Sequence, residues 1–308
     1  MNKLIKQAFT LIELLVVIAI IGILSGLIVV SMSGVTQKAN IAKAQVFSSS
    51  LRNSLMLDMV SEWKLDGGTI GNAVVVGDVL DSWSNNNATT IAGSPIVKGG
   101  NDCVSGNCIK FDGSSGIGFG NKAAFSMGTK DHTISLWVSF DNAVSAGNET
   151  LIKTGAGNSL AGYDGYWIYR YPSNGAIYLM FEDGTTTRIG GYLTSTAFST
   201  VNVWYNIAVV MNRDGLAQAY INGEKQSGYS VDISTQQGDV QNSDVLSIGT
   251  YSSGDRLIGK MDEVRIFHAI PPTSWIEEQY YFGLNKLLTS GNISITDYQS
   301  RLLIIAKK

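Results

Sequence analysis

The stretch that most constrains this chain covers residues 9–30, which are apolar except for Thr10, Glu13 and Ser25. As a helix, this stretch would extend roughly 33 Å, which is about one hydrocarbon thickness. It is therefore long enough to cross a bilayer. Lysines at positions 3 and 6 precede it, and this favours a cytoplasmic N-terminus with the rest of the chain sent outward.

Glu13 is the unusual residue of this stretch. A carboxylate in hydrocarbon costs on the order of 3 kcal/mol and normally has a partner. In one interpretation, Glu13 lies close to the cytoplasmic headgroups and pairs there with Lys6. A second interpretation comes from a family resemblance.

The string "AFTLIELLVVIAIIGIL" resembles the N-terminus of type IV prepilins and pseudopilins, which have a short basic leader before a small residue and a phenylalanine. The resemblance implies that a prepilin peptidase cuts between Ala8 and Phe9 and methylates the new amine of Phe9. It also implies that Glu13 pairs with the N-terminal ammonium of a neighbouring subunit. Ala8 stands where the family usually has glycine.

Four segments are expected. Residues 1–8 are the leader, and residues 9–60 form one helix whose transmembrane part covers about 9–32. Apolar residues continue at helical spacing after the span, for example at Phe47, Leu51 and Leu55. Residues 61–271 are expected to be a β-sandwich head, and residues 272–308 a helical tail.

Composition narrows the possible functions. Charged residues make up 15% of the 308 residues, the net charge is −3 and glycine occurs 34 times. No basic run follows the leader, so nucleic-acid binding is not expected. Cys103 and Cys108 are the two cysteines, and in an exported chain they predict a local disulfide.

Short alternating strands and turns fill residues 61–271. In "HTISLWVSF" every second residue from Ile134 to Phe140 is apolar, and Asn222-Gly223 predicts a hairpin turn. Together with "LSIGTY" and "LIGKMDEVRIF", these strings resemble bacterial laminin-G-like, concanavalin A-like jelly rolls. The resemblance implies a mainly β fold, and that fold hosts lectins, hydrolases and structural modules.

Residues 272–308 return to helical periodicity, with "TSGN" between two helices. The spacing resembles a SHOCT-type helical hairpin. Two roles stay open for this tail: docking onto its own head, or contact with another subunit.

Catalysis is not expected. The two histidines, His132 and His268, stand near no plausible nucleophile in sequence, so no triad can be assembled. The pairs in "FEDG" and "MDEV" are adjacent, and adjacent strand residues face opposite sides.

Calcium is the cofactor that the resemblance implies. In similar folds a structural calcium ties the first strand to the last, and the matching residues here are Asp66 and Asp262, with oxygen ligands of the kind that calcium prefers. Asp81 and Asn85, in the "DSWSNNN" loop, form a weaker second group. Alternatively, these aspartates are ordinary turn and edge residues.

The stretch "GYDGYWIYRY" is the richest in aromatic residues. Alternation places Trp167 and Tyr169 on one face and Arg170 on the other, and one of these faces must pack the core. Rings can stack on sugars, so Trp167, Tyr169 and Arg170 are the candidate ligand residues.

The combined prediction is a type IV pilin-like filament subunit whose lectin-like head serves adhesion or surface recognition. Its partners would be other pilin subunits, the prepilin peptidase and a glycan or surface protein. It would be a single-pass inner-membrane precursor and then part of a surface pilus or a pseudopilus. The alternatives are a type II secretion pseudopilin that contacts cargo or partner pseudopilins, and a membrane-anchored glycoside hydrolase.

Overall fold

The computed structural model describes residues 11–12, 14–22, 43, 46, 58–143, 147–154, 164–184, 188–195, 198, 200–241, 244–249 and 255–306. The chain divides into two compact units, Met1–Ser50 and Leu51–Lys308. Within the first unit, residues 11–12 and 14–22 are helical, as predicted. Across the described ranges, no helix is long and apolar enough to span a membrane. The predicted processing and assembly residues Ala8, Phe9 and Glu13 lie outside the described residues.

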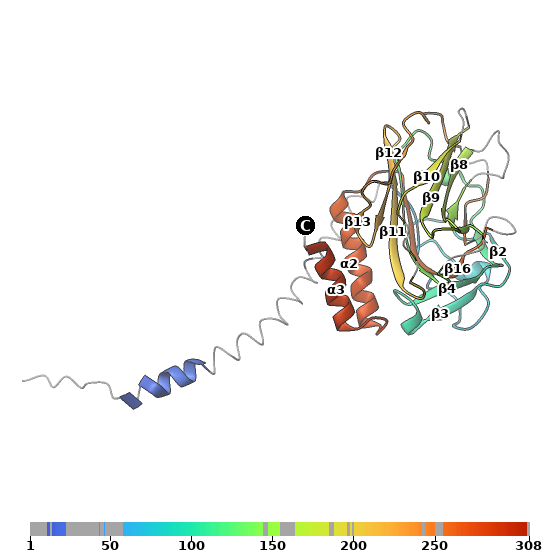
Figure 1. Cartoon of the computed structure of the whole chain (residues 1–308). Helices are drawn as coiled ribbons and strands as arrows, with labels where there is room; N and C mark the ends of the chain where they lie inside the picture. Colours follow the sequence, from blue (N-terminus) through green and yellow to red (C-terminus); the bar gives the residue numbers. More distant parts are fainter. Residues whose placement is uncertain are drawn as a thin grey trace, which may run out of the picture. The chain divides into compact units, whose positions relative to one another are not determined.

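The second unit contains a two-sheet sandwich (Figure 1). Sheet A has the order β13 (Glu224–Lys225), β12 (Leu216–Ile221), β11 (Trp204–Met211), β6 (His132–Phe140), β16 (Ile258–Phe267), β4 (Asn107–Asp112) and β3 (Ile96–Gly99). In the same sheet, β1 (Met59–Trp63) pairs with β16, and β14 (Val231–Asp232) pairs with β12. Sheet B has the order β10 (Ile189–Tyr192), β9 (Ile177–Asp183), β8 (Asp164–Arg170), β7 (Glu149–Lys153), β15 (Ser247–Ile248), β5 (Gly116–Gly118) and β2 (Thr90–Ala92).

Three short 3-10 helices and two α-helices complete the described elements. They are η1 (Val76–Asp78), η2 (Gly100–Asp102), η3 (Ala123–Phe125), α2 (Thr273–Thr289) and α3 (Ile295–Ala306).

The core lies between the inner faces of the two sheets, as period-two alternation requires. Ile134, Leu136, Val138 and Phe140 of β6 all belong to it, as predicted. The other residues of β6 are also buried, so this strand is covered on both faces. The hairpin turn at Asn222-Gly223 is present too, with left-handed φ values of 54° and 79°.

The head begins earlier than predicted. Helical periodicity was expected to continue to residue 60, but β1 begins at Met59. Met59 faces Phe267 in the antiparallel pair of β1 with β16. Pairing with the longest strand of the sheet therefore overrides the local helical pattern at these residues.

The tail docks on its own head, which was one of its two open roles. Figure 1 shows α2 and α3 beside sheet A. Tyr280 of α2 stacks on Trp137 of β6 with 5.8 Å between the ring centroids. A Cβ at Gly283 would collide with the Trp137 ring, so glycine permits this close approach of helix and sheet. The outer face of sheet A is therefore covered here by the tail.

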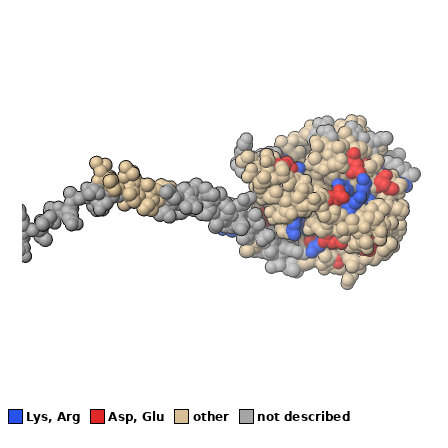
Figure 2. All heavy atoms as spheres, turned by 90° about the horizontal axis from the view of Figure 1, so that it is seen from below, with Lys and Arg blue, Asp and Glu red and all other residues tan. Residues whose placement is uncertain are grey.

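Charges are sparse on the head. Figure 2 shows a mostly uncharged face on which Lys and Arg side chains lie next to Asp and Glu. This distribution offers no extended basic surface on the face shown.

Candidate functional site

The outer face of sheet B, which points away from the core, carries the aromatic residues of the predicted ligand site. Trp167 and Tyr169 of β8 lie there, while Tyr166 and Ile168 of the same strand belong to the core. Tyr169 faces Tyr178 of β9 in the sheet register, and Tyr178 faces Tyr192 of β10. Three neighbouring strands therefore place aromatic residues on one face.

We call these rings the aromatic cluster, and its members are Trp167, Tyr169, Tyr171, Tyr178 and Tyr192. The centroids of Trp167 and Tyr169 are 4.3 Å apart, and those of Tyr169 and Tyr178 are 5.2 Å apart. Tyr192 stands edge-on to Tyr178 at 5.1 Å, with an interplanar angle of 87°. The rings thus form one continuous contact chain across the sheet.

Exposure increases along the aromatic cluster toward the edge strand β10. Trp167 and Tyr169 are 5% and 2% exposed, whereas Tyr192 is 37% exposed. Tyr171 and Tyr178 are half-buried. A ligand would therefore meet Tyr171, Tyr178 and Tyr192 first, with Trp167 and Tyr169 as the support behind them. Sequence reasoning did not select Tyr178 and Tyr192, because each stands alone in its strand and only the sheet register adds it to β8.

Lys153 of β7 closes the buried end of the aromatic cluster. Its ammonium lies 4.4 Å from the Trp167 ring centroid, a cation–π distance. Burial lowers the pKa of Lys153 to about 7, against the opposing effect of Asp255 and Asp244, and Arg188 lowers it further. The charges of Asp244, Asp255 and Arg188 therefore all act on Lys153.

Arg170 is a correction to the predicted ligand set. Its side chain is fully buried and forms an ion pair with Glu149, whose side chain is also fully buried. The guanidinium also donates to Asn142 Oδ1 at 2.7 Å and to the Phe198 carbonyl at 3.1 Å. Its Cζ lies 4.1 Å from the Phe140 ring centroid. A side chain held on every side in the interior cannot contact a ligand.

The first calcium pair is Asp66 and Asp262, and both carboxylates accept hydrogen bonds from the backbone of residues 104–107. Asp262 Oδ2 accepts from the amides of Val104 and Ser105 at 2.9 and 3.1 Å. Asp66 Oδ1 accepts from the amide of Asn107 at 2.9 Å. Burial, followed by the charges of Glu263 and Asp66, holds the pKa of Asp262 well above its usual range.

One observation favours a cation at this pair. Asp262 Oδ1 is fully buried and has no hydrogen-bond partner, and a buried carboxylate oxygen normally has one. The pair has few side-chain ligands to offer. In the described part of the chain, no three or more His, Cys, Asp or Glu residues lie together as a metal-binding group. Calcium would therefore need backbone oxygens in addition to the two aspartates.

In the weaker calcium group, Asp81 and Asn85 form hydrogen bonds within the protein. Asp81 Oδ1 accepts from the amides of Glu62 and Trp83, and its Oδ2 accepts from Ser84 Oγ and the Asn86 amide. The Asn85 carbonyl accepts from Lys122 Nζ at 3.2 Å. Four donors already bond to the two oxygens of the Asp81 carboxylate. This carboxylate therefore stabilises the loop and is not available to bind a metal.

The two histidines lie side by side, with His132 buried and His268 half-buried. Their ring centroids are 5.1 Å apart, and His132 Nε2 lies 3.2 Å from the Tyr166 hydroxyl. Burial and the neighbouring His268 lower the pKa of His132 well below its usual value. Burial also lowers the pKa of His268 to about 4, with a smaller contribution from Lys130.

Comparison with known families gives two matches. Residues 111–276 match the Concanavalin A-like lectin/glucanases superfamily, and residues 5–29 match the prokaryotic N-terminal methylation motif. No curated protein matches the chain at a significant level.

Solved structures share the fold of the head. Domain 4 of AbnA, a GH43 extracellular arabinanase from Geobacillus stearothermophilus solved in complex with arabinotriose, is 17% identical with a TM-score of 0.53; the match covers 72% of this chain and 97% of that domain. The binding domain of Paraclostridial Mosquitocidal Protein 1 is 18% identical with a TM-score of 0.55, and the match covers 75% of this chain and 53% of that chain. The Botulinum neurotoxin serotype G binding domain is 16% identical with a TM-score of 0.54, and the match covers 74% of this chain and 51% of that chain. The chain thus spans about half of each toxin domain, and these identities establish the fold alone.

Proposed function

We propose a function for this chain, which belongs to the Concanavalin A-like lectin/glucanases superfamily and carries a prokaryotic N-terminal methylation motif. In our proposal it is a type IV pilin-like filament subunit whose sandwich head recognises a saccharide. It acts by assembly and display and has no catalytic role.

The aromatic cluster carries the recognition half of this proposal. The tail covers the outer face of sheet A around Trp137 and Trp204, while the outer face of sheet B ends in half-buried and exposed tyrosines. Aromatic faces pack against the apolar faces of sugar rings, and tyrosine hydroxyls can bond sugar hydroxyls. The domain of AbnA with arabinotriose shows the same fold in a protein solved with a saccharide, which supports the choice of ligand class.

The charges beside the aromatic cluster favour an uncharged saccharide. The charges of Asp244, Asp255 and Arg188 all act on Lys153, which is only partly protonated near neutral pH because its pKa is about 7, so the net charge of these four groups is small. An acidic or basic ligand would gain little from such a surface, and its binding would depend on salt.

The assembly half rests on the N-terminal motif. Cleavage would fall between Ala8 and Phe9 in the inner membrane, and Glu13 would pair with the new Phe9 ammonium of the next subunit. Loss of surface filaments or of adhesion when the chain is deleted would favour a pilus. Loss of a secreted enzyme would instead favour the pseudopilin alternative.

The experiment is a glycan array probed with the full chain in detergent, coupled densely to beads. Dense display raises avidity by ~10²-fold or more and makes a weak single site detectable. We expect binding to neutral saccharides that persists at high salt. Silence on every glycan would contradict saccharide recognition and direct the search to protein ligands.

Calcium is a separate proposal. Asp66 and Asp262 would hold it, and a bound cation would supply the partner that Asp262 Oδ1 lacks. Its role would be to stabilise the junction between β16 and the segment after β1.

A further inference from the structure

Residues 103–108, which we call the disulfide loop, lead into β4 of sheet A and share an apolar cluster with the tail. Cys103 and Cys108 form the predicted disulfide, and both residues are 0% exposed. Their neighbours in one apolar cluster include Leu284 and Leu287 of α2 and Tyr298 near the start of α3. The tail therefore packs against the disulfide.

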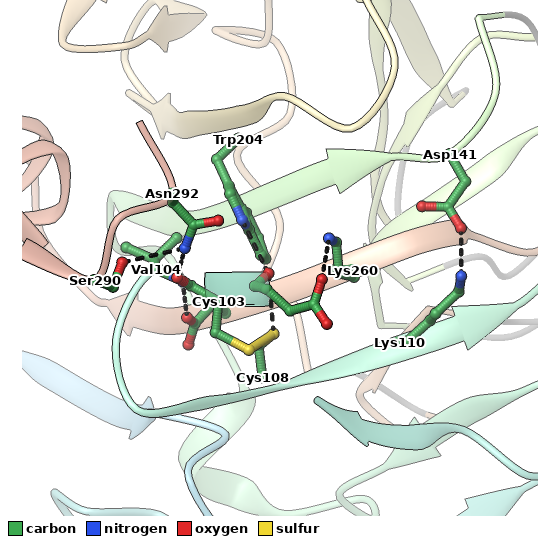
Figure 3. Close-up of polar contacts among 11 residues, drawn as sticks. Cys103, Val104, Cys108, Lys110, Asp141, Trp204, Lys260, Ser290 and Asn292 are labelled. Atoms are coloured by element: carbon green, nitrogen blue, oxygen red, sulfur yellow. Dashed lines mark hydrogen bonds and ion pairs between the residues drawn. A yellow bond between two sulfur atoms is a disulfide. The ribbon is translucent and has the colours of Figure 1, made fainter. Parts of the chain in front are cut away.

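A hydrogen bond also joins the tail to the same loop. Asn292, in the turn between α2 and α3, donates from Nδ2 to the Cys103 carbonyl at 2.6 Å. From β11 of sheet A, Trp204 Nε1 donates to the Asp102 carbonyl at 3.2 Å, just before the loop. Figure 3 shows Asn292 and Trp204 pointing at the loop from different elements. The tail is thus fitted to one particular backbone course of the disulfide loop.

That course is fixed from the side of the sheet as well. The amides of Val104, Ser105 and Asn107 all donate to the carboxylates of Asp262 and Asp66. Gly106 has a left-handed φ of 57°, and a Cβ there would collide with Asp66 Oδ1. A short covalent ring that presents three amides in this way loses fewer conformations on folding than an open loop does.

We propose that the disulfide and the docked tail form a redox latch: the disulfide shapes the loop surface on which α2 and α3 dock, and the docked tail shields the disulfide from thiols. Each state stabilises the other, because coupling between two equilibria is reciprocal. Oxidation outside the cytoplasm favours the docked tail, and a docked tail preserves the oxidised loop.

The chemistry places a condition on reduction. The thiolate of an external dithiol attacks one cysteine sulfur, the S–S bond breaks, and the electron pair leaves on the other cysteine as a thiolate that takes up a proton. The second thiol of the reagent, after losing its proton, attacks the mixed disulfide. This step releases the first cysteine as a thiolate, which takes up a proton, and the dithiol becomes a disulfide. Attack needs direct access to a sulfur, so reduction passes through a state in which the tail has moved away.

The first test measures the reduction rate of Cys103–Cys108 by dithiothreitol in the full chain in detergent, followed by alkylation and mass spectrometry. Leu287→Ala truncates a fully buried side chain of the apolar cluster that includes both cysteines, and we expect at least about tenfold faster reduction. Leu303→Ala is the matched control, because Leu303 lies on α3 and is 58% exposed; its rate should equal that of the unchanged chain. Equal rates for Leu287→Ala and the unchanged chain would overturn the shielding half.

The second test runs in the opposite direction. In the chain with Cys103→Ser and Cys108→Ser, we expect faster hydrogen exchange in residues 273–306, with unchanged exchange in β8 and β9 of sheet B as the internal reference. Unchanged exchange in the tail would overturn the shaping half.

A third variant covers the case in which Leu287→Ala loosens the whole head. Asn292→Ala removes one hydrogen bond to the Cys103 carbonyl and no core side chain. Faster reduction in Asn292→Ala, with β8 and β9 still protected, would support the latch. A rate equal to that of the unchanged chain would count against it.

Discussion

Arg170 and Glu149 form an ion pair inside the head in which both side chains are fully buried. Arg170 lies on β8, the strand of Trp167 and Tyr169, and Glu149 Oε1 also accepts from the Ile258 amide of β16 at 3.1 Å. The pair therefore links β8, which carries two rings of the aromatic cluster, to the longest strand of the other sheet.

Replacing Arg170 should destabilise the head without acting on the ligand. Arg170→Met leaves Glu149 buried without its cation, and we expect a loss of about 3 to 5 kcal/mol in the free energy of unfolding, measured by urea denaturation. Lys225→Met, at an exposed strand residue, is the control and should change little. A loss of glycan binding in Arg170→Met at unchanged stability would contradict the interior role of Arg170.

Ligand affinity should depend on the exposed end of the aromatic cluster. Tyr192→Ala removes a ring that is 37% exposed, and we expect affinity for a neutral saccharide to fall on the order of tenfold. Tyr229→Ala is the matched control, since Tyr229 is 38% exposed and lies outside the aromatic cluster. If titration calorimetry gave equal affinities for the two variants, the saccharide would not bind at the aromatic cluster.

Calcium should act through the protonation of Asp262. The pKa of Asp262 is raised in the folded state above the unfolded value of 3.8, so the folded protein holds this proton more tightly. Stability contributed by the bound proton is therefore lost as pH rises from the unfolded to the folded pKa. Added calcium should restore it, which melting curves with calcium and with chelator would measure.

The variant Asp262→Asn gives the corresponding control, because its amide imitates the protonated acid. We expect it to melt at a temperature independent of calcium, while Asp214→Asn, at an exposed turn residue, should respond as the unchanged chain does. A calcium response that survives in Asp262→Asn would place the metal elsewhere.

Acid should destabilise the head through the histidine pair. The pKa of His268 is lowered from 6.5 to about 4, and that of His132 is lowered as well. The unfolded chain therefore takes up protons first, so stability is lost as pH falls from about 6.5 toward 4. Urea midpoints measured across this range should fall less in His268→Gln than in the unchanged chain; parallel curves would show that other groups carry the acid effect.

Filament assembly should depend on Glu13, which is part of our proposal. Glu13→Val should leave membrane insertion and leader cleavage intact and impair incorporation into filaments, because the neighbouring ammonium would lack its partner. Ser25→Val, in the same apolar stretch, is the control and should assemble normally. Cells that assemble Glu13→Val as efficiently as the control would disprove the pairing.

The fold was predictable from the sequence where a period of two is enforced by the core. The apolar residues of β6 and the turn at Asn222-Gly223 follow from local rules, and the Cys103–Cys108 disulfide follows from export. The residue at which the first strand of the sandwich begins was not predictable. Met59 also fits a helical pattern, and only its pairing with Phe267 places it in a strand.

The candidate site was less predictable because it depends on contacts between distant segments. Alternation placed Trp167 and Tyr169 on one face, but it did not show which face was buried deeper. Arg170 looked like a surface cation until Glu149 supplied a buried partner 21 residues away. Tyr192 enters the aromatic cluster through register across two strands, which a single segment does not encode.

The pairing of Met59 with Phe267 has a further consequence for how such a protein can be rebuilt. The first and last strands of the sandwich lie side by side, so the polypeptide enters and leaves the sandwich at neighbouring points. A module with adjacent ends can be excised, transplanted into a host loop or circularly permuted with little disturbance. The head is therefore suited to exchange by recombination as a cassette, with the N-terminal segment left unchanged.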